Sequence, residues 1–179
     1  MAGSSFSRAL SGLAGALRGA RLPSEVRTAL DLEPGERLLS HARAPEGDAG
    51  DGGGYAVATT LALHLPGGQR LPWHLVDKAT WDENGLTVVM TDGEIHAVAL
   101  PEPGLLPETI RERVTSSIVA SRHVSLDARG GVRLVARRVP GSDQPRWDFV
   151  FDPGLDASDP GLRALAEQAL EEVRRSLGV

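Results

Sequence analysis

Two turn signals in the middle of the sequence limit what the chain can fold into. Glu83-Asn84-Gly85 and Thr91-Asp92-Gly93 contain Asn-Gly and Asp-Gly pairs, which readily adopt the positive φ angles of tight hairpins. They predict a meander of three antiparallel strands. Shorter β-rich runs bounded by Pro and Gly precede this meander and predict further strands. The predicted strands of this half of the chain cover residues 36–44, 55–59, 61–65, 69–73, 76–81, 86–90 and 94–100.

The second half of the sequence predicts a helix and three more strands. Leu106, Ile110, Val114 and Ile118 recur at four-residue steps, as they would on one face of a helix over residues 107–118. The three strands are predicted at 122–127, 132–139 and 146–151.

A closing helix is the plainest element of the sequence. Asp159 is the expected N-cap, and Pro160 occupies the first helical position, where proline is favoured. No alternation of strand and crossover helix appears, so a parallel sheet is not predicted. The predicted class is α+β, with a strongly twisted antiparallel sheet or partial barrel, a C-terminal helix and an N-terminal helical extension. The apolar stripe of the closing helix consists of Leu162, Leu165, Ala166, Ala169, Leu170, Val173 and Leu177.

Residues 1–31 form the predicted N-terminal extension, an amphipathic helical segment, and residues 32–179 form the domain that follows. At about 100° per residue, four apolar residues of the extension share one face of a helix and two arginines lie opposite. Several glycines weaken this helix, so it needs a surface on which to dock. Ser24 is the expected N-cap of a second, short helix. The predicted partner-binding residues are Phe6, Arg8, Leu10, Leu13, Leu17 and Arg18.

Composition excludes several classes of protein. The chain has 19 basic and 24 acidic residues, a formal charge of −5, which argues against a nucleic-acid binder. The absence of cysteine removes disulfides and thiolate chemistry. No apolar run approaches the roughly 20 residues of a membrane-spanning helix. We therefore expect a cytoplasmic protein. Peripheral contact with a membrane through the N-terminal helix is left open.

Four short segments carry a resemblance to a known family: Gly35-Glu-Arg-Leu-Leu39, Tyr55-Ala-Val-Ala-Thr-Thr60, Leu61-Ala-Leu-His-Leu65 and Arg70-Leu-Pro-Trp-His-Leu-Val76. In order they resemble the bacterial pleckstrin-homology-like domains. Arginine-rich usage with a single lysine, Lys78, suggests a GC-rich actinobacterial genome. The resemblance implies a binding or scaffolding module.

That family closes seven strands with one helix, whereas this chain continues with three strands and another helix. Either residues 32–179 form one enlarged barrel, or a barrel over 32–118 is followed by a β-β-β-α unit over 119–179.

Catalytic and metal-binding constellations are weak in this sequence. The five histidines lack the spacing of local zinc ligands, and no nucleophile elbow exposes a serine. Arg133 and Arg137 share one face of a predicted strand, which we interpret as a solvated face. No cofactor or metal is predicted, and the sequence favours a non-enzyme.

The leading hypothesis is a non-enzymatic, cytoplasmic interaction or scaffolding module that contacts a protein partner through its N-terminal helix. A position close to a membrane is left open. The alternative is a small-molecule binding protein or enzyme that uses the open end of the barrel, with His74, Asp77 and Trp81 near the pocket.

Overall fold

The computed structural model describes residues 21–45 and 54–177. The predicted partner-binding helix, with Phe6, Arg8, Leu10, Leu13, Leu17 and Arg18, lies outside these residues.

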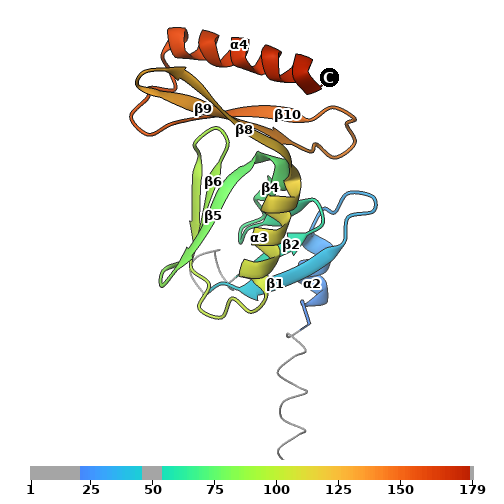
Figure 1. The fold of residues 1–179 in the computed structure, drawn as a ribbon. Coiled ribbons are helices and arrows are strands. Elements are labelled where there is room, and N and C mark those ends of the chain that lie inside the picture. Colours follow the sequence, from blue (N-terminus) through green and yellow to red (C-terminus); the bar gives the residue numbers. More distant parts are fainter. Residues whose placement is uncertain (1–20, 46–53, 178–179) are drawn as a thin grey trace, which may run out of the picture.

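Seven strands form two antiparallel sheets in the first part of the structure (Figure 1). In the first sheet, the four strands follow one another in chain order. The second sheet is the predicted meander, again in chain order. The first sheet consists of β1 (Leu38–Arg43), β2 (Tyr55–Thr59), β3 (Ala62–His64) and β4 (Arg70–Pro72), and the second of β5 (Val76–Asp82), β6 (Gly85–Met90) and β7 (Ile95–Val98).

A single 3-10 turn, η1 (Trp73–Leu75), carries the chain from the first sheet to the second. The first of these strands ends at Pro72, one residue before the predicted end at Trp73, because Trp73 is the first residue of the turn; Val76 begins the next strand, as predicted. Within the described residues no strand of one sheet pairs with a strand of the other, so the two sheets do not close into a barrel. The α+β class with antiparallel sheets is confirmed.

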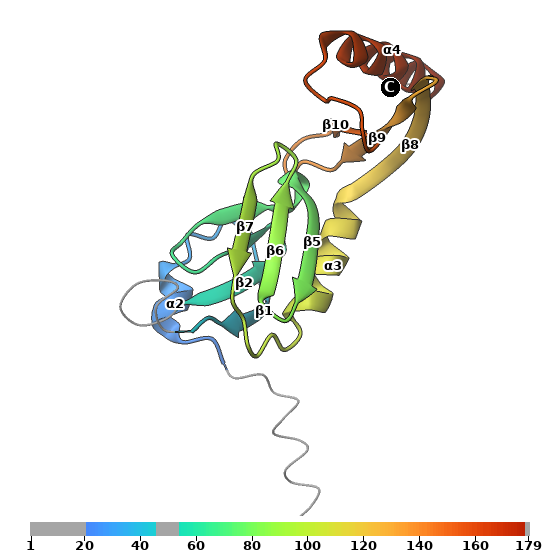
Figure 2. The same cartoon turned by 90° about the vertical axis from the view of Figure 1, so that its left-hand side faces the viewer.

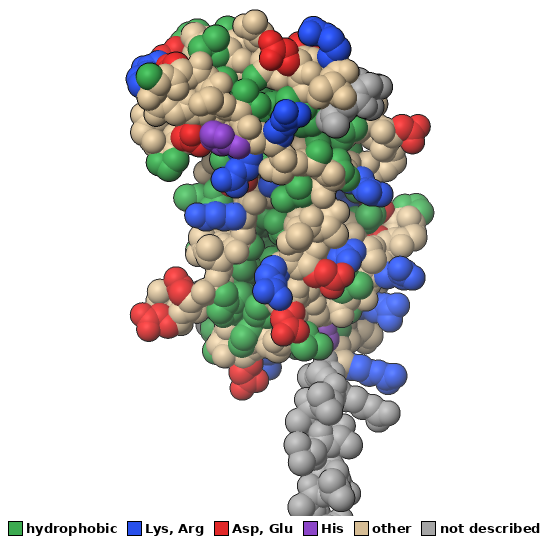
Figure 3. All heavy atoms as spheres, viewed as in Figure 1, with side chains coloured by type: hydrophobic (Ala, Val, Ile, Leu, Met, Phe, Trp, Pro, Cys, Tyr) green, Lys and Arg blue, Asp and Glu red, His purple; other side chains and the backbone are tan. Residues whose placement is uncertain are grey.

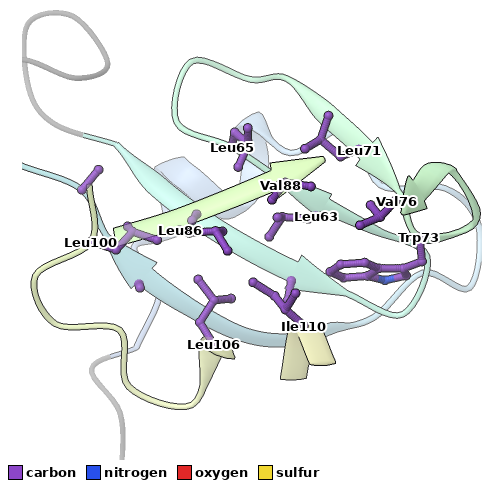
Figure 4. Packing of buried hydrophobic residues seen from close by; sticks show 14 of the residues in the cluster. Leu63, Leu65, Leu71, Trp73, Val76, Leu86, Val88, Leu100, Leu106 and Ile110 are labelled. Atoms are coloured by element: carbon purple, nitrogen blue, oxygen red, sulfur yellow. The ribbon is translucent and has the colours of Figure 1, made fainter. Parts of the chain in front are cut away.

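One hydrophobic core fills the space between the two sheets and the helix α3 (Leu106–Ser117). Figure 4 shows Leu106 and Ile110 of α3 pointing toward the strands, with Leu63 and Leu86 opposite them. The apolar four-residue steps of the sequence thus give α3 its buried face. The predicted last member of that face, Ile118, is instead the first residue of the next strand, and it is 36% exposed.

The short helix α2 (Ser24–Ala29) precedes the first sheet and buries none of its residues. The predicted N-cap role of Ser24 is wrong. Pro23 occupies that position, and it provides no side-chain cap. Ser24 lies one residue inside the helix, where its backbone carbonyl accepts a hydrogen bond from Thr28 Oγ1 (2.9 Å).

The C-terminal part contains a third antiparallel sheet covered on one face by a long helix (Figure 2). Its strands lie in the order β10-β9-β8, and a second hydrophobic cluster lies between this sheet and the helix. Asp159 Oδ1 accepts a hydrogen bond from the backbone N–H of Gly161 (2.7 Å), which confirms the predicted cap. Leu165 of the predicted stripe is 40% exposed. The elements are β8 (Ile118–Asp127), β9 (Gly130–Arg137), β10 (Arg146–Phe151) and α4 (Pro160–Leu177).

None of the helices in the described ranges has the length and apolar character needed to cross a membrane.

Candidate interaction groove

A groove lies between strand β5 and the first turns of α3. Its cavity has a volume of about 350 Å³. Leu86 and Ile110, both 2% exposed, are its most deeply buried lining residues, and Trp81 is half-buried beside them. We call this feature the Trp81 groove; its lining residues are Ala79, Thr80, Trp81, Leu86, Pro107, Glu108, Ile110 and Arg111. Figures 1 and 3 view this side of the molecule, and Figure 3 shows apolar side chains on it with charged groups around them.

One wall of the Trp81 groove is the edge of a sheet. Strand β5 has β6 as its only strand neighbour in the described residues. Asp82 and Gly85 face each other across a two-residue turn, and such a closing pair exchanges backbone hydrogen bonds. Because bonded and non-bonded pairs alternate, Ala79 and Trp81 direct their backbone groups toward the free edge. The groove therefore combines a pocket of mixed polar and apolar lining with backbone donors and acceptors that have no strand partner in the described residues.

Charge is unevenly distributed along the Trp81 groove. Asp82 and Glu83 follow Trp81 in the β5–β6 turn, and Glu108 lines the start of the helical wall; all three are exposed. Arg111 lines the cavity one helical turn further on, and Lys78 is exposed on β5. The end of the groove near the β5–β6 turn and the start of α3 is acidic, and we call it the acidic end.

Of the three residues predicted near a pocket, His74 and Asp77 do not line the Trp81 groove. Only Trp81 lines the groove. Asp77 lies at the other end of β5, where its backbone carbonyl accepts a hydrogen bond from Arg137 Nη2 (3.3 Å). His74 lies in η1 with its Nδ1 buried and without a hydrogen-bond partner. Burial, followed by the nearby Arg146 and Arg70 charges, lowers the pKa of His74.

Arg137 joins the two parts of the structure and is 2% exposed. Its guanidinium donates to Ser117 Oγ (3.1 Å) at the end of α3 and lies 3.5 Å from Asp148 Oδ2 on β10. Burial lowers the pKa of Arg137, although Asp148 and Asp77 oppose this effect. The prediction of a solvated face is wrong for Arg137, because its end of β9 meets β5 and α3. It is correct for Arg133, which is exposed.

A second buried polar cluster holds the start of the first sheet. The carboxylate of Glu36 accepts hydrogen bonds from Thr59 Oγ1 and from the backbone N–H of Glu33 (2.9 Å), and Arg70 Nη2 lies 3.4 Å away. Burial alone would raise the pKa of Glu36, but these hydrogen bonds and the Arg70 charge together lower it. His64 is 4% exposed, and burial lowers its pKa despite its contact with Glu36. Because the carboxylate is enclosed by its partners, this cluster is structural.

A second cavity, of about 400 Å³, lies between the β3–β4 turn and the edge strand β7. His96 lines it, and its buried Nε2 has no hydrogen-bond partner, although Glu94 Oε1 lies 3.5 Å away. In the described ranges, no group of three or more His, Asp or Glu residues is placed to hold a metal ion.

Sequence reasoning missed most of the Trp81 groove. Alternation along β6 and the four-residue steps of α3 indicate that Leu86 and Ile110 are buried, but no local pattern places α3 beside β5. Glu108 and Arg111 carry no local signal beyond their exposed positions on a helix. None of the protein families, curated proteins or solved structures with which the chain was compared matches it.

Proposed function

We propose that this protein is an interaction module that binds an extended segment of a partner protein in the Trp81 groove. The observation that carries the proposal is the cavity with buried Leu86 and Ile110 in its lining, beside the edge of β5 that has no strand partner in the described residues. An extended segment supplies backbone groups for Ala79 and Trp81, and one of its apolar side chains fills the cavity. A basic residue of the same segment meets the acidic end. The partner segment is therefore an apolar and basic one.

The wider architecture supports a pleckstrin-homology-like core for this module. Seven antiparallel strands in two sheets are followed by α3, which is the order that the family resemblance implies. We propose that residues 32–118 form this core and that residues 119–179 form a separate β-β-β-α unit with its own hydrophobic cluster. A cytoplasmic location remains part of the proposal.

Selection of short random peptides displayed on phage tests this function. Peptides selected on the full chain are expected to contain an apolar residue next to Arg or Lys. In titrations followed by NMR they are expected to shift the amide signals of residues 79–81 and 108–111. Selected peptides whose signals map elsewhere would contradict the proposal.

Two substitutions sharpen this test. Truncation of an anchor side chain typically costs more than about 1 kcal/mol of binding, so Trp81→Ala is expected to weaken binding roughly 10-fold. Glu108→Arg is expected to weaken the binding of basic peptides more than the binding of uncharged ones. Glu167→Arg, at an exposed position of α4, is the matched control and leaves binding unchanged. Equal loss with Glu108→Arg and Glu167→Arg would show that the acidic end has no part in recognition.

Contact with a membrane surface through the N-terminal segment remains a second proposal, supported by its basic and apolar pattern. Flotation with phosphatidylcholine vesicles containing phosphatidylserine tests it in the full chain. The wild type is expected to float, and a Leu10→Asp, Leu13→Asp double variant is expected to stay behind. Equal behaviour of the two proteins would remove the proposal.

A small-molecule site is also proposed, at the cavity beside His96 and not at the predicted pocket of His74, Asp77 and Trp81. The buried Nε2 of His96 makes no hydrogen bond, with Glu94 Oε1 3.5 Å away, and a small polar ligand would supply one. NMR screening with a set of small carboxylates and alcohols should then shift the amides of residues 95–98. A screen that leaves these signals in place would remove the alternative.

A further inference from the structure

We infer that the Trp81 groove selects both the direction and the charge order of its partner segment. From its N-terminus to its C-terminus, the segment carries basic residues first, then an apolar residue, then an acidic residue. The inference rests on the proposed function, because it concerns the same groove. It follows from the pairing rules of an added strand and from the charges of β5 and α3.

Strand β5 can pair with an added strand at its free edge. Figure 2 shows β5 at the outside of its sheet, with β6 on one side and α3 beside the other. In the part of the chain that the structure describes, β6 is the only strand that pairs with β5. Antiparallel pairing is slightly more stable per residue than parallel pairing. The bound segment therefore runs antiparallel to β5, so that it enters beside Asp82 and leaves beside Lys78.

The pairing register gives each residue of the bound segment a place. Because Ala79 and Trp81 direct their backbone groups toward the free edge, each forms a hydrogen-bonded pair with one residue of the segment. The residue opposite Trp81 comes first, and the residue opposite Ala79 follows two positions later. Directly opposed side chains lie on the same face of a sheet. These two residues therefore lie on the face of β5 that lines the groove with α3, and their neighbours lie on the outward face.

The residue opposite Ala79 is apolar. Ala79 has a small side chain and lines the cavity of about 350 Å³, so space remains for a larger side chain beside it. Ile110 of α3, which is 2% exposed, lines the same cavity. A leucine at this place packs against Ile110, and its burial removes apolar surface from water.

The residue opposite Trp81 is an arginine. Trp81 is half-buried, and a guanidinium can stack on the exposed part of its indole ring. Glu108 is exposed on the helical wall of the groove, and its carboxylate attracts the same cation. Arginine suits this place better than lysine, because its planar group both stacks on aromatic rings and pairs with carboxylates.

The outward face of β5 supplies the remaining charges. Lys78, Thr80 and Asp82 alternate with the residues that line the groove face, and all three are exposed. Asp82 Oδ1 accepts a hydrogen bond from the backbone N–H of Asn84 (2.8 Å), which fixes this carboxylate at the end of the strand. A basic residue opposite Asp82 and an acidic residue opposite Lys78 each form a cross-strand pair of opposite charge. The preferred order is therefore a basic residue, Arg, any residue, an apolar residue and an acidic residue.

Two peptides of the same composition test the direction. The first is acetyl-Arg-Arg-Ser-Leu-Glu-amide, and the second has the same residues in reverse order. Lys78 is the only lysine of the chain, and Glu is the only carboxylate of either peptide, so a carbodiimide can join the two through an amide bond. We expect the first peptide to couple to Lys78 of the full chain and the reversed peptide to couple much less, as measured by mass spectrometry of the digested product.

Three results of the coupling experiment would overturn the inference. Coupling of the reversed peptide to Lys78 to an equal or greater extent would show that the direction is wrong. Coupling of both peptides chiefly to the amine at the start of the chain would show a non-specific contact. Absence of coupling, while peptides selected from the random library bind in the groove, would refute the charge order.

Charge reversal on the protein is the second test. Lys78→Glu is expected to weaken binding of the first peptide roughly 5-fold, and a peptide with Lys in place of its Glu is expected to recover the loss. Arg163→Glu makes the same change in net charge at an exposed position of α4 and leaves binding unchanged. Both positions are exposed, so neither variant is expected to unfold. Equal weakening by the two variants would refute the role of Lys78.

The results also separate this inference from the proposed function. Library peptides that shift residues 79–81 and 108–111, but bind equally well when their order is reversed, would refute the direction and leave the function standing. Library peptides whose signals all map to other residues would refute the function, and the direction with it.

Discussion

Replacing Arg137 by methionine should destabilise the whole protein, because this side chain links three separate elements. The guanidinium donates to Ser117 Oγ and to the backbone carbonyl of Asp77, at 3.1 and 3.3 Å, and its Nε lies 3.5 Å from Asp148 Oδ2. Methionine keeps the apolar stem as far as the position of Nε but removes the rest of the guanidinium, with its charge and every donor.

The size of the effect follows from what the substitution leaves behind. Removing one partner of a buried ion pair typically costs 3–5 kcal/mol, because the other charge stays buried without compensation. Here Asp148 keeps Arg146, whose Nε donates to its Oδ1 at 3.0 Å, and Asp77 is 35% exposed. Both facts reduce the cost, so we expect a loss of about 3 kcal/mol.

Urea unfolding followed by circular dichroism measures this loss. Arg137→Lys retains the charge but not the planar fork, so it should lose roughly half as much. Arg146→Met is the matched control, since its side chain is 44% exposed and exposed ion pairs contribute less than about 1 kcal/mol. Adding Asp148→Asn to Arg137→Met should recover part of the loss. A loss below about 1 kcal/mol for Arg137→Met, or one equal to that of Arg146→Met, would refute the reasoning.

Three further predictions concern pH, a turn and a helix cap. Burial lowers the pKa of His64 and of His74 below 6.5 in the folded protein, so the unfolded chain takes up protons first as the pH falls. The free energy of unfolding should therefore decrease below pH 6.5, by up to about 1.4 kcal/mol per pH unit for each histidine. Between pH 7 and pH 5.5, His64→Gln should lose less of this free energy than the wild type. Gly85→Ala should be severely destabilising, because φ is 121° and a Cβ would lie 2.3 Å from the Val98 carbonyl oxygen. Gly93→Ala is the control, since Gly93 has a positive φ but open space around it, and it should cost about 1 kcal/mol. Equal melting temperatures of the two variants would contradict the clash. Asp159→Ala should cost about 1 kcal/mol through loss of the cap of α4, and an unchanged urea midpoint would show that the cap contributes nothing.

The comparison of sequence and structure separates local signals from distant ones. The Asn84-Gly85 and Asp92-Gly93 turns were predictable because residues a few positions apart determine a hairpin, and strands β5, β6 and β7 followed from them. The cap of α4 was predictable for the same reason. Arg137 shows the limit. Alternation placed it correctly on one face of β9 with Arg133, but its contact with Asp77 spans 60 positions of sequence.

The candidate site was less predictable than the fold. Of the residues predicted near a pocket, Trp81 lines the groove. Its neighbours Pro107 and Ile110 come from a helix whose packing beside β5 depends on the whole core. His74 and Asp77 are close to Trp81 in sequence, but the turn η1 and the register shift at the start of β5 separate them from the groove.

Helix α3 and strand β8 follow one another without a loop, since the helix ends at Ser117 and the strand begins at Ile118. The helix is one wall of the Trp81 groove, and the strand is an edge of the C-terminal sheet. Because no loop separates the two elements, and because Arg137 contacts both Ser117 and Asp77, we expect a segment bound in the groove to alter the amide signals of β8 and of Arg137 as well as those of α3.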